Sequence, residues 1–322
     1  MSRRTTSFPT TPVVRLVGHN GPVHALAFSA SSGQYLLTGS QDRKIRLFNP
    51  STAKLVQTFS AHGYEVLDIA VSQDNARFAS VGGDKVVFVW DVATAQTLRR
   101  FQGHAGRVNA VGFGGEGDGV VVTGSYDGTV RVWDTKSRAD RPVMVLSEAK
   151  DSVSCIAVAG SRIYAGSVDG RVRVYDLAMG EVGVDVMGAS VTSITPTGAE
   201  DGYLVSTLDS KVRLMDRATG QCLQTFTGDG FANETYRVRS ALGAADGVAI
   251  SGSEDGRVFV WDVLSGEIIH SLWHKQGWNG TESEGSKFAK QDVVAAVAWN
   301  QIRKTLASAG GDGEVVIWGM GD

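Results

Sequence analysis

Histidine and cysteine are the side chains with which this 322-residue sequence could bind a metal or transfer protons. The two cysteines, Cys155 and Cys222, lie far apart and form no Cys-x-x-Cys pair. His270 and His274 have the four-residue spacing of a helical zinc site, but residues 267–273 read as a strand, where this spacing corresponds to about 13 Å. The other histidines are His19, His24, His62 and His104. No nucleophile, base or ligand set gathers in one place, so we expect neither an enzyme nor a metal site.

One glycine-rich segment resembles a phosphate-binding loop. Residues 114–119 contain four glycines, but they precede an apolar, strand-like run, whereas a phosphate-binding loop opens a helix. The carboxylates of Glu116 and Asp118 would also repel phosphate. We therefore expect a hairpin loop here and no cofactor.

The aspartates, by contrast, follow a repeat. Each of seven aspartates lies in a short turn and is followed six residues later by a large side chain. The seven are Asp42, Asp84, Asp127, Asp169, Asp209, Asp255 and Asp312. They are 40 to 46 residues apart, except that the last follows after 57. This regular period indicates a structural unit written seven times and argues against a catalytic cluster.

Each unit reads as about four β-strands. Val130–Trp133 and Val172–Tyr175 alternate apolar and polar side chains, which indicates one buried face per strand. Gly and Asp between such runs are typical of hairpin turns. A four-stranded sheet that repeats seven times buries both faces by stacking radially. The sequence therefore predicts an all-β, seven-bladed β-propeller over residues 12–319.

The two ends of the chain are predicted to complete one blade. Four residues follow Trp318, whereas the strand-like Val13–Val17 precedes the first unit. We expect this amino-terminal strand to finish the last blade and close the ring, which removes two sheet edges. Residues 1–11 and 320–322 are then expected to be flexible tails. The polar segment 275–291, between blades six and seven, is either a tolerated surface insertion or a partner-binding arm.

The repeats also resemble a known family. Histidines occur 22 or 23 residues before the first three turn aspartates, and Trp-Asp pairs close units two, three and six. This pattern resembles the WD-repeat family, in which histidine, Ser/Thr, aspartate and tryptophan form a buried hydrogen-bonded chain. The resemblance implies two such chains, namely His62, Ser80, Asp84 and Trp90, and His104, Thr123, Asp127 and Trp133. Phe48 and Met215 cannot donate an indole N–H, and units four and five lack the histidine. Blades two and three are therefore expected to be the stiffest.

Longer phrases are similar to one subfamily. Gly63-Tyr64-Glu65-Val66 and Ser206-Thr207-Leu208 resemble the mitogen-activated protein kinase organizer family of WD-repeat proteins. That resemblance implies a non-catalytic scaffold for kinase-cascade components in the cytoplasm, for spliceosomal proteins in the nucleus, or for both. The alternatives are a purely nuclear pre-mRNA splicing subunit and a propeller that binds RNA directly.

Members of this family bind proteins on the narrow face of the ring. By position, that face is expected to carry the residue before each turn aspartate and the residues that enter each innermost strand. The candidates are Gln41, Tyr126, Val168, Leu208, Glu254, His24, Glu65, Leu67, Arg107 and Asn109. Tyrosine and arginine are enriched in binding hot spots, so we expect Tyr126 and Arg107 at the centre of a patch over blades two to four.

Composition narrows the class of partner. The 31 basic and 34 acidic residues give a net charge of −3, without the basic stripe of a nucleic-acid-binding protein. No apolar run has the length of a signal peptide or a membrane span. Two cysteines are too few for a disulfide framework and suit a reducing compartment. We expect a cytoplasmic and nuclear protein that is monomeric outside its complexes and contacts neither membrane nor nucleic acid.

Overall fold

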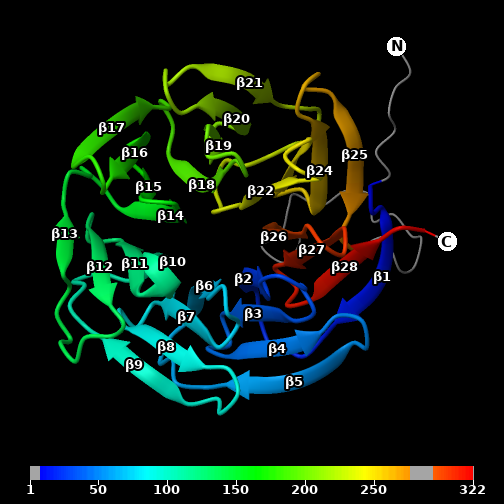
Figure 1. The fold of residues 1–322 in the computed structure, drawn as a ribbon. Coiled ribbons are helices and arrows are strands. Elements are labelled where there is room, and N and C mark those ends of the chain that lie inside the picture. Colours follow the sequence, from blue (N-terminus) through cyan, green and yellow to red (C-terminus); the bar gives the residue numbers. More distant parts are fainter. Residues whose placement is uncertain (1–7, 276–292, 322) are drawn as a thin grey trace.

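Seven four-stranded antiparallel sheets surround a central axis and form a closed ring (Figure 1). The computed structural model describes residues 8–275 and 293–321. Within these ranges the chain is built from strands, with one 3-10 turn at Glu116–Asp118 in the loop that joins two strands of the third blade. The predicted all-β, seven-bladed propeller is therefore confirmed.

In blades one to six, the four strands follow one another in the chain from the innermost to the outermost. Blade seven takes its three inner strands from the end of the chain and its outermost strand from the amino terminus. Blades one to three contain β2 (Val23–Phe28), β3 (Leu36–Ser40), β4 (Ile45–Asn49) and β5 (Lys54–Phe59); β6 (Val66–Val71), β7 (Arg77–Gly82), β8 (Val87–Asp91) and β9 (Thr97–Phe101); and β10 (Val108–Gly114), β11 (Val120–Ser125), β12 (Val130–Asp134) and β13 (Met144–Leu146). Blades four and five contain β14 (Val153–Ala159), β15 (Arg162–Ser167), β16 (Arg171–Asp176) and β17 (Glu181–Val186); and β18 (Val191–Pro196), β19 (Gly202–Thr207), β20 (Lys211–Asp216) and β21 (Cys222–Phe226). Blades six and seven contain β22 (Ser240–Gly243), β23 (Val248–Gly252), β24 (Arg257–Asp262) and β25 (Ile268–Trp273); and β26 (Val294–Asn300), β27 (Thr305–Gly310), β28 (Val315–Gly319) and β1 (Thr11–Leu16).

The repeated aspartate builds the turn between the second and third strands of a blade. In the third blade, Asp127 Oδ1 accepts a hydrogen bond from the backbone N–H of Thr129 at 3.0 Å. Ser125 Oγ accepts one from the N–H of Asp127 at 3.1 Å. Gly128 occupies the left-handed region with φ of 77°, which an L side chain rarely adopts. The geometry of the turn therefore favours glycine after the aspartate, although Arg43, Lys85 and Ser210 adopt the same left-handed conformation in blades one, two and five.

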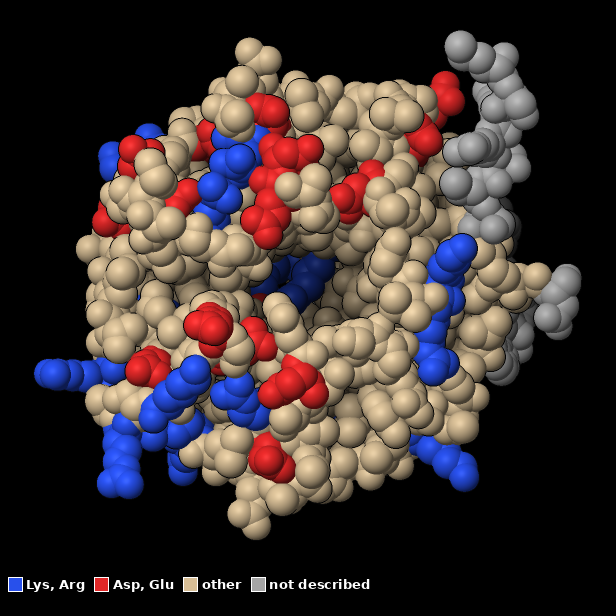
Figure 2. All heavy atoms as spheres, viewed as in Figure 1, with Lys and Arg blue, Asp and Glu red and all other residues tan. Residues whose placement is uncertain are grey.

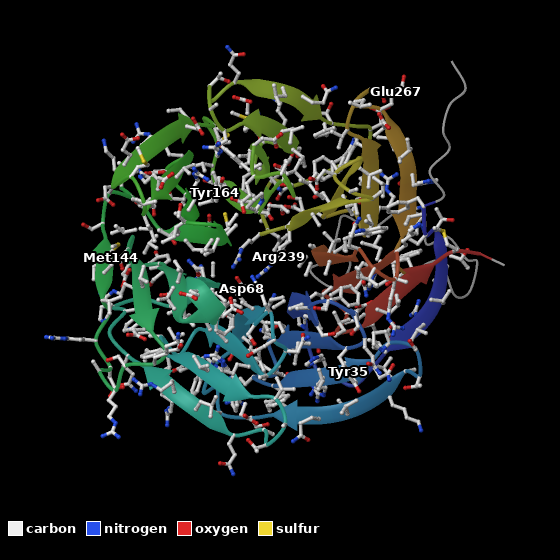
Figure 3. All side chains as sticks on the ribbon, in the orientation of Figure 1. Tyr35, Asp68, Met144, Tyr164, Arg239 and Glu267 are labelled. Carbon is white, nitrogen blue, oxygen red and sulfur yellow. The ribbon has the colours of Figure 1, made fainter. Side chains whose placement is uncertain are left out.

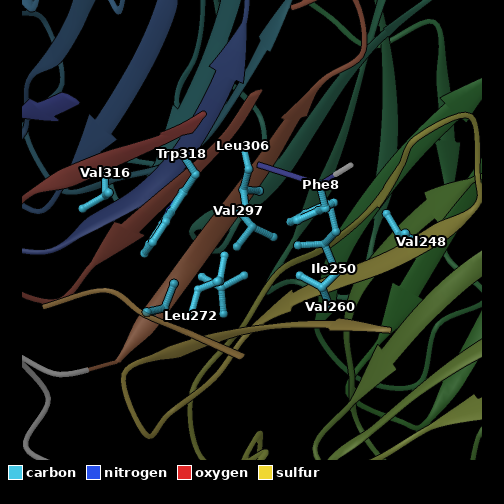
Figure 4. Close-up of a cluster of buried hydrophobic side chains, with 11 residues drawn as sticks. Phe8, Val248, Ile250, Val260, Leu272, Val297, Leu306, Val316 and Trp318 are labelled. Carbon is cyan, nitrogen blue, oxygen red and sulfur yellow. The ribbon is translucent and has the colours of Figure 1, made fainter. Parts of the chain in front are cut away.

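The hydrophobic core lies between the blades, where neighbouring sheets stack face to face. The middle strands are almost entirely buried, as in β8, while the outer strand β5 of the preceding blade is mostly exposed. Figure 4 shows the cluster between blades six and seven, where Ile250 and Val260 face Leu306 and Trp318. Radial stacking of this kind buries both faces of each sheet, as the seven-fold repeat predicted.

The amino-terminal strand closes the ring. β1 pairs antiparallel with β28, from Thr11 opposite Gly319 to Leu16 opposite Val315. An ion pair of 2.5 Å joins Arg15 Nη1 to Glu314 Oε2 across this seam. The predicted closure is thus confirmed.

The boundary of the predicted amino-terminal tail needs correction. Phe8 is 8% exposed and belongs to the cluster between blades six and seven, and β1 begins at Thr11, so the expected tail of residues 1–11 extends too far. An aromatic ring that can reach an apolar seam is stabilised by burial there. The predicted insertion at 275–291 lies, apart from Lys275, outside the described residues.

Candidate functional site

The two hydrogen-bonded chains predicted in blades two and three are both formed. In blade two, His62 Nδ1 lies 2.7 Å from Asp84 Oδ2 and its Nε2 lies 2.8 Å from Ser80 Oγ. The same hydroxyl accepts a hydrogen bond from Trp90 Nε1 at 2.9 Å. These four residues link the loop that enters the blade to its two middle strands, β7 and β8.

Blade three repeats this arrangement. His104 joins Asp127 at 2.9 Å and Thr123 at 2.8 Å, and Trp133 Nε1 donates to Thr123 Oγ1 at 2.9 Å. Burial lowers the pKa of His104, although Asp127 opposes this shift. Burial also disfavours the charge on Asp127, but hydrogen bonds from Thr129 and His104 outweigh it and hold that pKa well below its usual range. A neutral imidazole between a hydroxyl and a carboxylate is fully occupied and is part of the frame.

Blade seven contains part of a third chain, which the sequence analysis missed: the histidine, serine and tryptophan are hydrogen-bonded, and the aspartate lies at ion-pair distance. His274 Nδ1 lies 2.9 Å from Ser308 Oγ, which also accepts from Trp318 Nε1 at 2.8 Å. Asp312 Oδ1 is 3.8 Å from His274 Nε2. The signal was hidden because residues 276–292 separate His274 from the rest of its repeat. His270, which lies four residues before His274, stacks on Phe8 with ring centroids 5.5 Å apart.

Arginine replaces the absent histidine in blades four and five. Arg173 donates to Asp169 Oδ2 at 2.7 Å and to Ser167 Oγ at 2.8 Å. Arg213 makes the equivalent bonds to Asp209 and Thr207, both at 2.6 Å. The arginine follows the aspartate by four residues and reaches the same site from inside the blade. The turn aspartate is therefore paired in these blades as well, by a cation in place of an imidazole.

The predicted binding patch is centred on two residues of blade three. Tyr126 is 60% exposed, and the guanidinium carbon of Arg107 lies 5.3 Å from the centroid of its ring. The backbone N–H of Tyr126 donates to the carbonyl of Arg107 at 2.9 Å, which fixes the two residues side by side. A rigid aromatic ring stacked with a guanidinium is the type of surface that serves as a binding hot spot.

Several other candidates also reach the surface. Val168 is 41% exposed beside blade four, and Leu67 and Leu208 are partly exposed. Gln41 is exposed in a groove together with Glu65, and His24 Nε2 lies 3.9 Å from Glu65 Oε2.

Two candidates are not free to bind a partner. Glu254 is only 7% exposed, and its Oε1 accepts the backbone N–H groups of Glu234, Thr235 and Tyr236 at 2.7, 2.6 and 2.8 Å. The prediction that Glu254 lies on the docking surface is therefore wrong. Its carboxylate is buried and accepts three hydrogen bonds from the neighbouring loop. Asn109 is 6% exposed and donates to the carbonyl of Val153 at 2.7 Å, so only its edge faces the centre of the ring.

A cavity at the centre of the ring joins the candidates of blades one to three. It has a volume of about 320 Å³ and is lined by His24, Glu65, Leu67, Arg107 and Asn109, together with Tyr236, Arg237, Arg239 and parts of blade seven. Figure 2 shows basic side chains on the floor of this central hollow. Five of the candidates from blades one to three thus converge on one opening, whereas Gln41 and Tyr126 lie outside its lining.

The arginines of blade six were not expected at this site. Arg239 Nη1 lies 2.8 Å from Asp68 Oδ1 of blade two, and both residues are at the centre of Figure 3. Arg239 Nη2 donates to the carbonyl of Leu67 at 2.9 Å, and Arg237 Nη1 donates to the carbonyl of Asn109 at 2.5 Å. The only signal in the sequence is the Arg-Val-Arg phrase before β22, in which the middle residue is buried and both arginines face the other way.

Two negative findings apply to the described ranges. No group of three or more His, Cys, Asp and Glu side chains in them could hold a metal ion. In the same ranges no helix has the length and apolar character needed to cross a membrane.

Seven stacked blades, two of which contain a complete buried His–Ser/Thr–Asp–Trp chain, define a WD-repeat β-propeller. The family model of the WD domain, G-beta repeat, matches residues 10–49, 53–91, 95–134, 140–176 and 220–262, so the chain belongs to this family. It is similar to human WD repeat domain-containing protein 83, with 44% identity over 78% of this chain and 79% of that protein. A Dictyostelium discoideum homolog of that protein is 28% identical over 80% of the chain and 86% of its own length. Autophagy-related protein 16 of Arabidopsis thaliana is 27% identical over 97% of the chain, which spans 58% of that protein.

Proposed function

We propose that this chain is a non-catalytic scaffold that assembles protein complexes through the narrow face of its ring. The observation that carries the proposal is the exposed Tyr126, stacked with Arg107, which lines the central cavity. A backbone hydrogen bond of 2.9 Å and the stacking of the two side chains hold this pair in place, so a partner that docks there loses little affinity to reordering of the surface. Leu67 and Val168 add apolar contact on either side.

The complexes proposed are kinase cascades in the cytoplasm and the spliceosome in the nucleus. The phrases that resemble the mitogen-activated protein kinase organizer family support this proposal. The similarity to WD repeat domain-containing protein 83 supports its coarser part, a WD-repeat protein that binds other proteins. The same surface can serve both settings, because a rigid platform binds whichever partner fits it.

Affinity purification followed by mass spectrometry tests the proposal. The tagged wild-type chain is compared with a Tyr126→Ala/Arg107→Ala variant and with a control, Leu264→Ala/Arg138→Ala. The control residues are exposed in the turns before β25 and β13, at the opposite ends of the strands from the turn aspartates. Loss of a hot-spot residue costs about 2 kcal/mol or more, so we expect about a 30-fold or greater loss of affinity for partners in the first variant alone.

The identity of the captured proteins separates the alternatives. Kinases together with splicing proteins support the proposal as stated, whereas splicing proteins alone, in nuclear extract alone, favour a purely nuclear subunit. Partners that disappear after RNase treatment would favour a propeller that binds RNA directly. Equal capture by the Tyr126→Ala/Arg107→Ala variant and the wild type would contradict docking on the narrow face.

A further inference from the structure

The central cavity contains more positive than negative charge. Three arginines, Arg107, Arg237 and Arg239, line it. Two carboxylates accompany them, Glu65 in the lining and Asp68 beneath Arg239. One positive charge therefore has no counterpart among the described residues at this opening.

Asp68 cannot neutralise more than one of the arginines. Its oxygens already accept the backbone N–H groups of Ile69 and Val111 at 2.8 and 3.0 Å, besides the short ion pair with Arg239. Arg237 Nη2 is 3.9 Å from Asp68 Oδ2, beyond the range of a hydrogen bond. The charge of Asp68 is thus largely committed to Arg239.

Arg237 is the arginine with capacity to spare. One of its terminal nitrogens donates to the carbonyl of Asn109, but within the described ranges its buried Nε has no hydrogen-bond acceptor. Burial lowers the pKa of Arg237 to about 10, and the neighbouring Arg239 adds to this shift. The Arg237 side chain is still 26% exposed, so an anion in the cavity can reach its guanidinium. A partly desolvated cation is stabilised by an anion placed against it.

We propose that this cavity binds one carboxylate from a Glu or Asp side chain of a partner protein, held by Arg237 and Arg107. The inference rests on the docking function proposed above and specifies its chemistry. A single carboxylate balances the excess charge, whereas a phosphate dianion would leave a net negative charge. A side chain fits better than a chain terminus because Leu67 of blade two and Ala295 of blade seven both line the opening, so a bound segment can continue across it.

The arginine Nε–Hε signals of the full chain in NMR spectra test this inference. Four probes are titrated: N-acetyl-glutamate methylamide, its glutamine analogue, N-acetylglycine as a chain terminus, and inorganic phosphate. We expect the glutamate derivative to move the Arg237 and Arg107 signals saturably and the glutamine analogue to leave them in place. Arg43 is exposed in the neighbouring groove and serves as the internal control.

Variants complete the test. Arg107→Gln changes an exposed side chain and should weaken binding of the glutamate derivative by about tenfold, since one charged hydrogen bond is lost. Arg43→Gln removes the same charge from the groove outside the cavity and should leave the affinity unchanged. Arg237→Gln should abolish saturation, with its melting temperature compared with that of the wild type to confirm folding.

Four results would overturn the inference: equal shifts with the glutamine analogue, equal shifts at Arg43, tighter binding of phosphate, or equal binding of N-acetylglycine. The two proposals also fail separately. If the Tyr126→Ala/Arg107→Ala variant loses its partners but no carboxylate binds to the wild type, the docking function is supported and the carboxylate site is refuted. If the carboxylate binds but partner capture does not depend on Tyr126 and Arg107, the docking function falls.

Discussion

Phe8 stacks on the indole of Trp299, with ring centroids 5.5 Å apart and ring planes 14° apart. Its other neighbour is His270 of β25, at the same centroid distance. Phe8, three residues before the closing strand β1, thus joins blade six to blade seven (Figure 4). The ring is held at its seam by an aromatic contact as well as by the pairing of β1 with β28.

Phe8→Ala should therefore destabilise the ring. Removal of a buried aromatic side chain leaves a cavity that costs about 3 kcal/mol. Urea unfolding followed by tryptophan fluorescence measures the difference in free energy of unfolding. Val17→Ala, in the same segment but 62% exposed, is the control and should change this free energy by less than about 0.5 kcal/mol. Equal stability of the two variants would show that the seam does not depend on Phe8.

Deletion of residues 1–18 should open the ring, because it removes β1 and leaves β28 as an unpaired edge. Exposed edges with apolar strands pair with other chains, so we expect aggregation. Size-exclusion chromatography with light scattering detects it. A monomeric deletion variant with an unchanged melting temperature would contradict closure by the amino-terminal strand.

Trp133→Ala should cost about 3–5 kcal/mol, because the indole is completely buried and its removal creates a large cavity. Trp133→Phe keeps most of the ring but removes the donor to Thr123, for which we expect about 1 kcal/mol. Trp273→Ala is the matched control, since that indole is 42% exposed. Thermal and urea unfolding give the order of the three variants, and an unchanged melting temperature of Trp133→Ala would be the contrary result.

The sequence predicted the frame of this protein better than its surface. The turn aspartates and the large residue six positions later recur in every blade, so the period alone gave the number of blades. The role of His274 in blade seven was not predicted, because the insertion lengthens that repeat. The pairing of Arg173 with the turn aspartate of blade four was not predicted, because the family pattern places an imidazole, and not a cation, against that aspartate.

The surface was harder to predict because position in a repeat does not fix what a neighbouring loop does. Glu254 occupies a place that is exposed in blades one, three and four, but residues 234–236 fold over it and donate three hydrogen bonds. Arg237 and Arg239 come from the same irregular stretch, which follows no repeat pattern. Their approach to Asp68 joins residues about 170 positions apart.

Acid should weaken the fold through the turn aspartates. Burial opposes the charge on Asp42, but hydrogen bonds from Arg46 and His19 outweigh it and lower its pKa to about 2. Because the folded pKa lies below the unfolded value of about 3.9, the stabilisation is complete above pH 4 and is lost as the pH falls to 2. The loss from this residue amounts to about 2 kcal/mol. The free energy of unfolding is measured for the wild type and Asp42→Asn between pH 5 and 2, and the difference between the two should become smaller as the pH falls. For Asp140→Asn, which changes an exposed carboxylate, the free energy of unfolding should depend on pH as it does in the wild type.

Replacement of Arg173 by methionine tests whether the cation is needed against the turn aspartate of blade four. The side chains of Arg173 and Asp169 are 4% and 9% exposed, so Arg173→Met leaves a buried carboxylate without its cation. We expect a loss of about 3–5 kcal/mol in the free energy of unfolding.

Arg213→Met is the matched comparison in blade five. Asp209 is 29% exposed there and has Lys211 Nζ within 3.6 Å, so water and a second cation can compensate and the loss should be smaller. Addition of Asp169→Asn to Arg173→Met should restore part of the stability, because the uncompensated charge is removed. Equal losses in the two blades, or no recovery in the double variant, would mean that the arginines stabilise the blades by packing and not by charge.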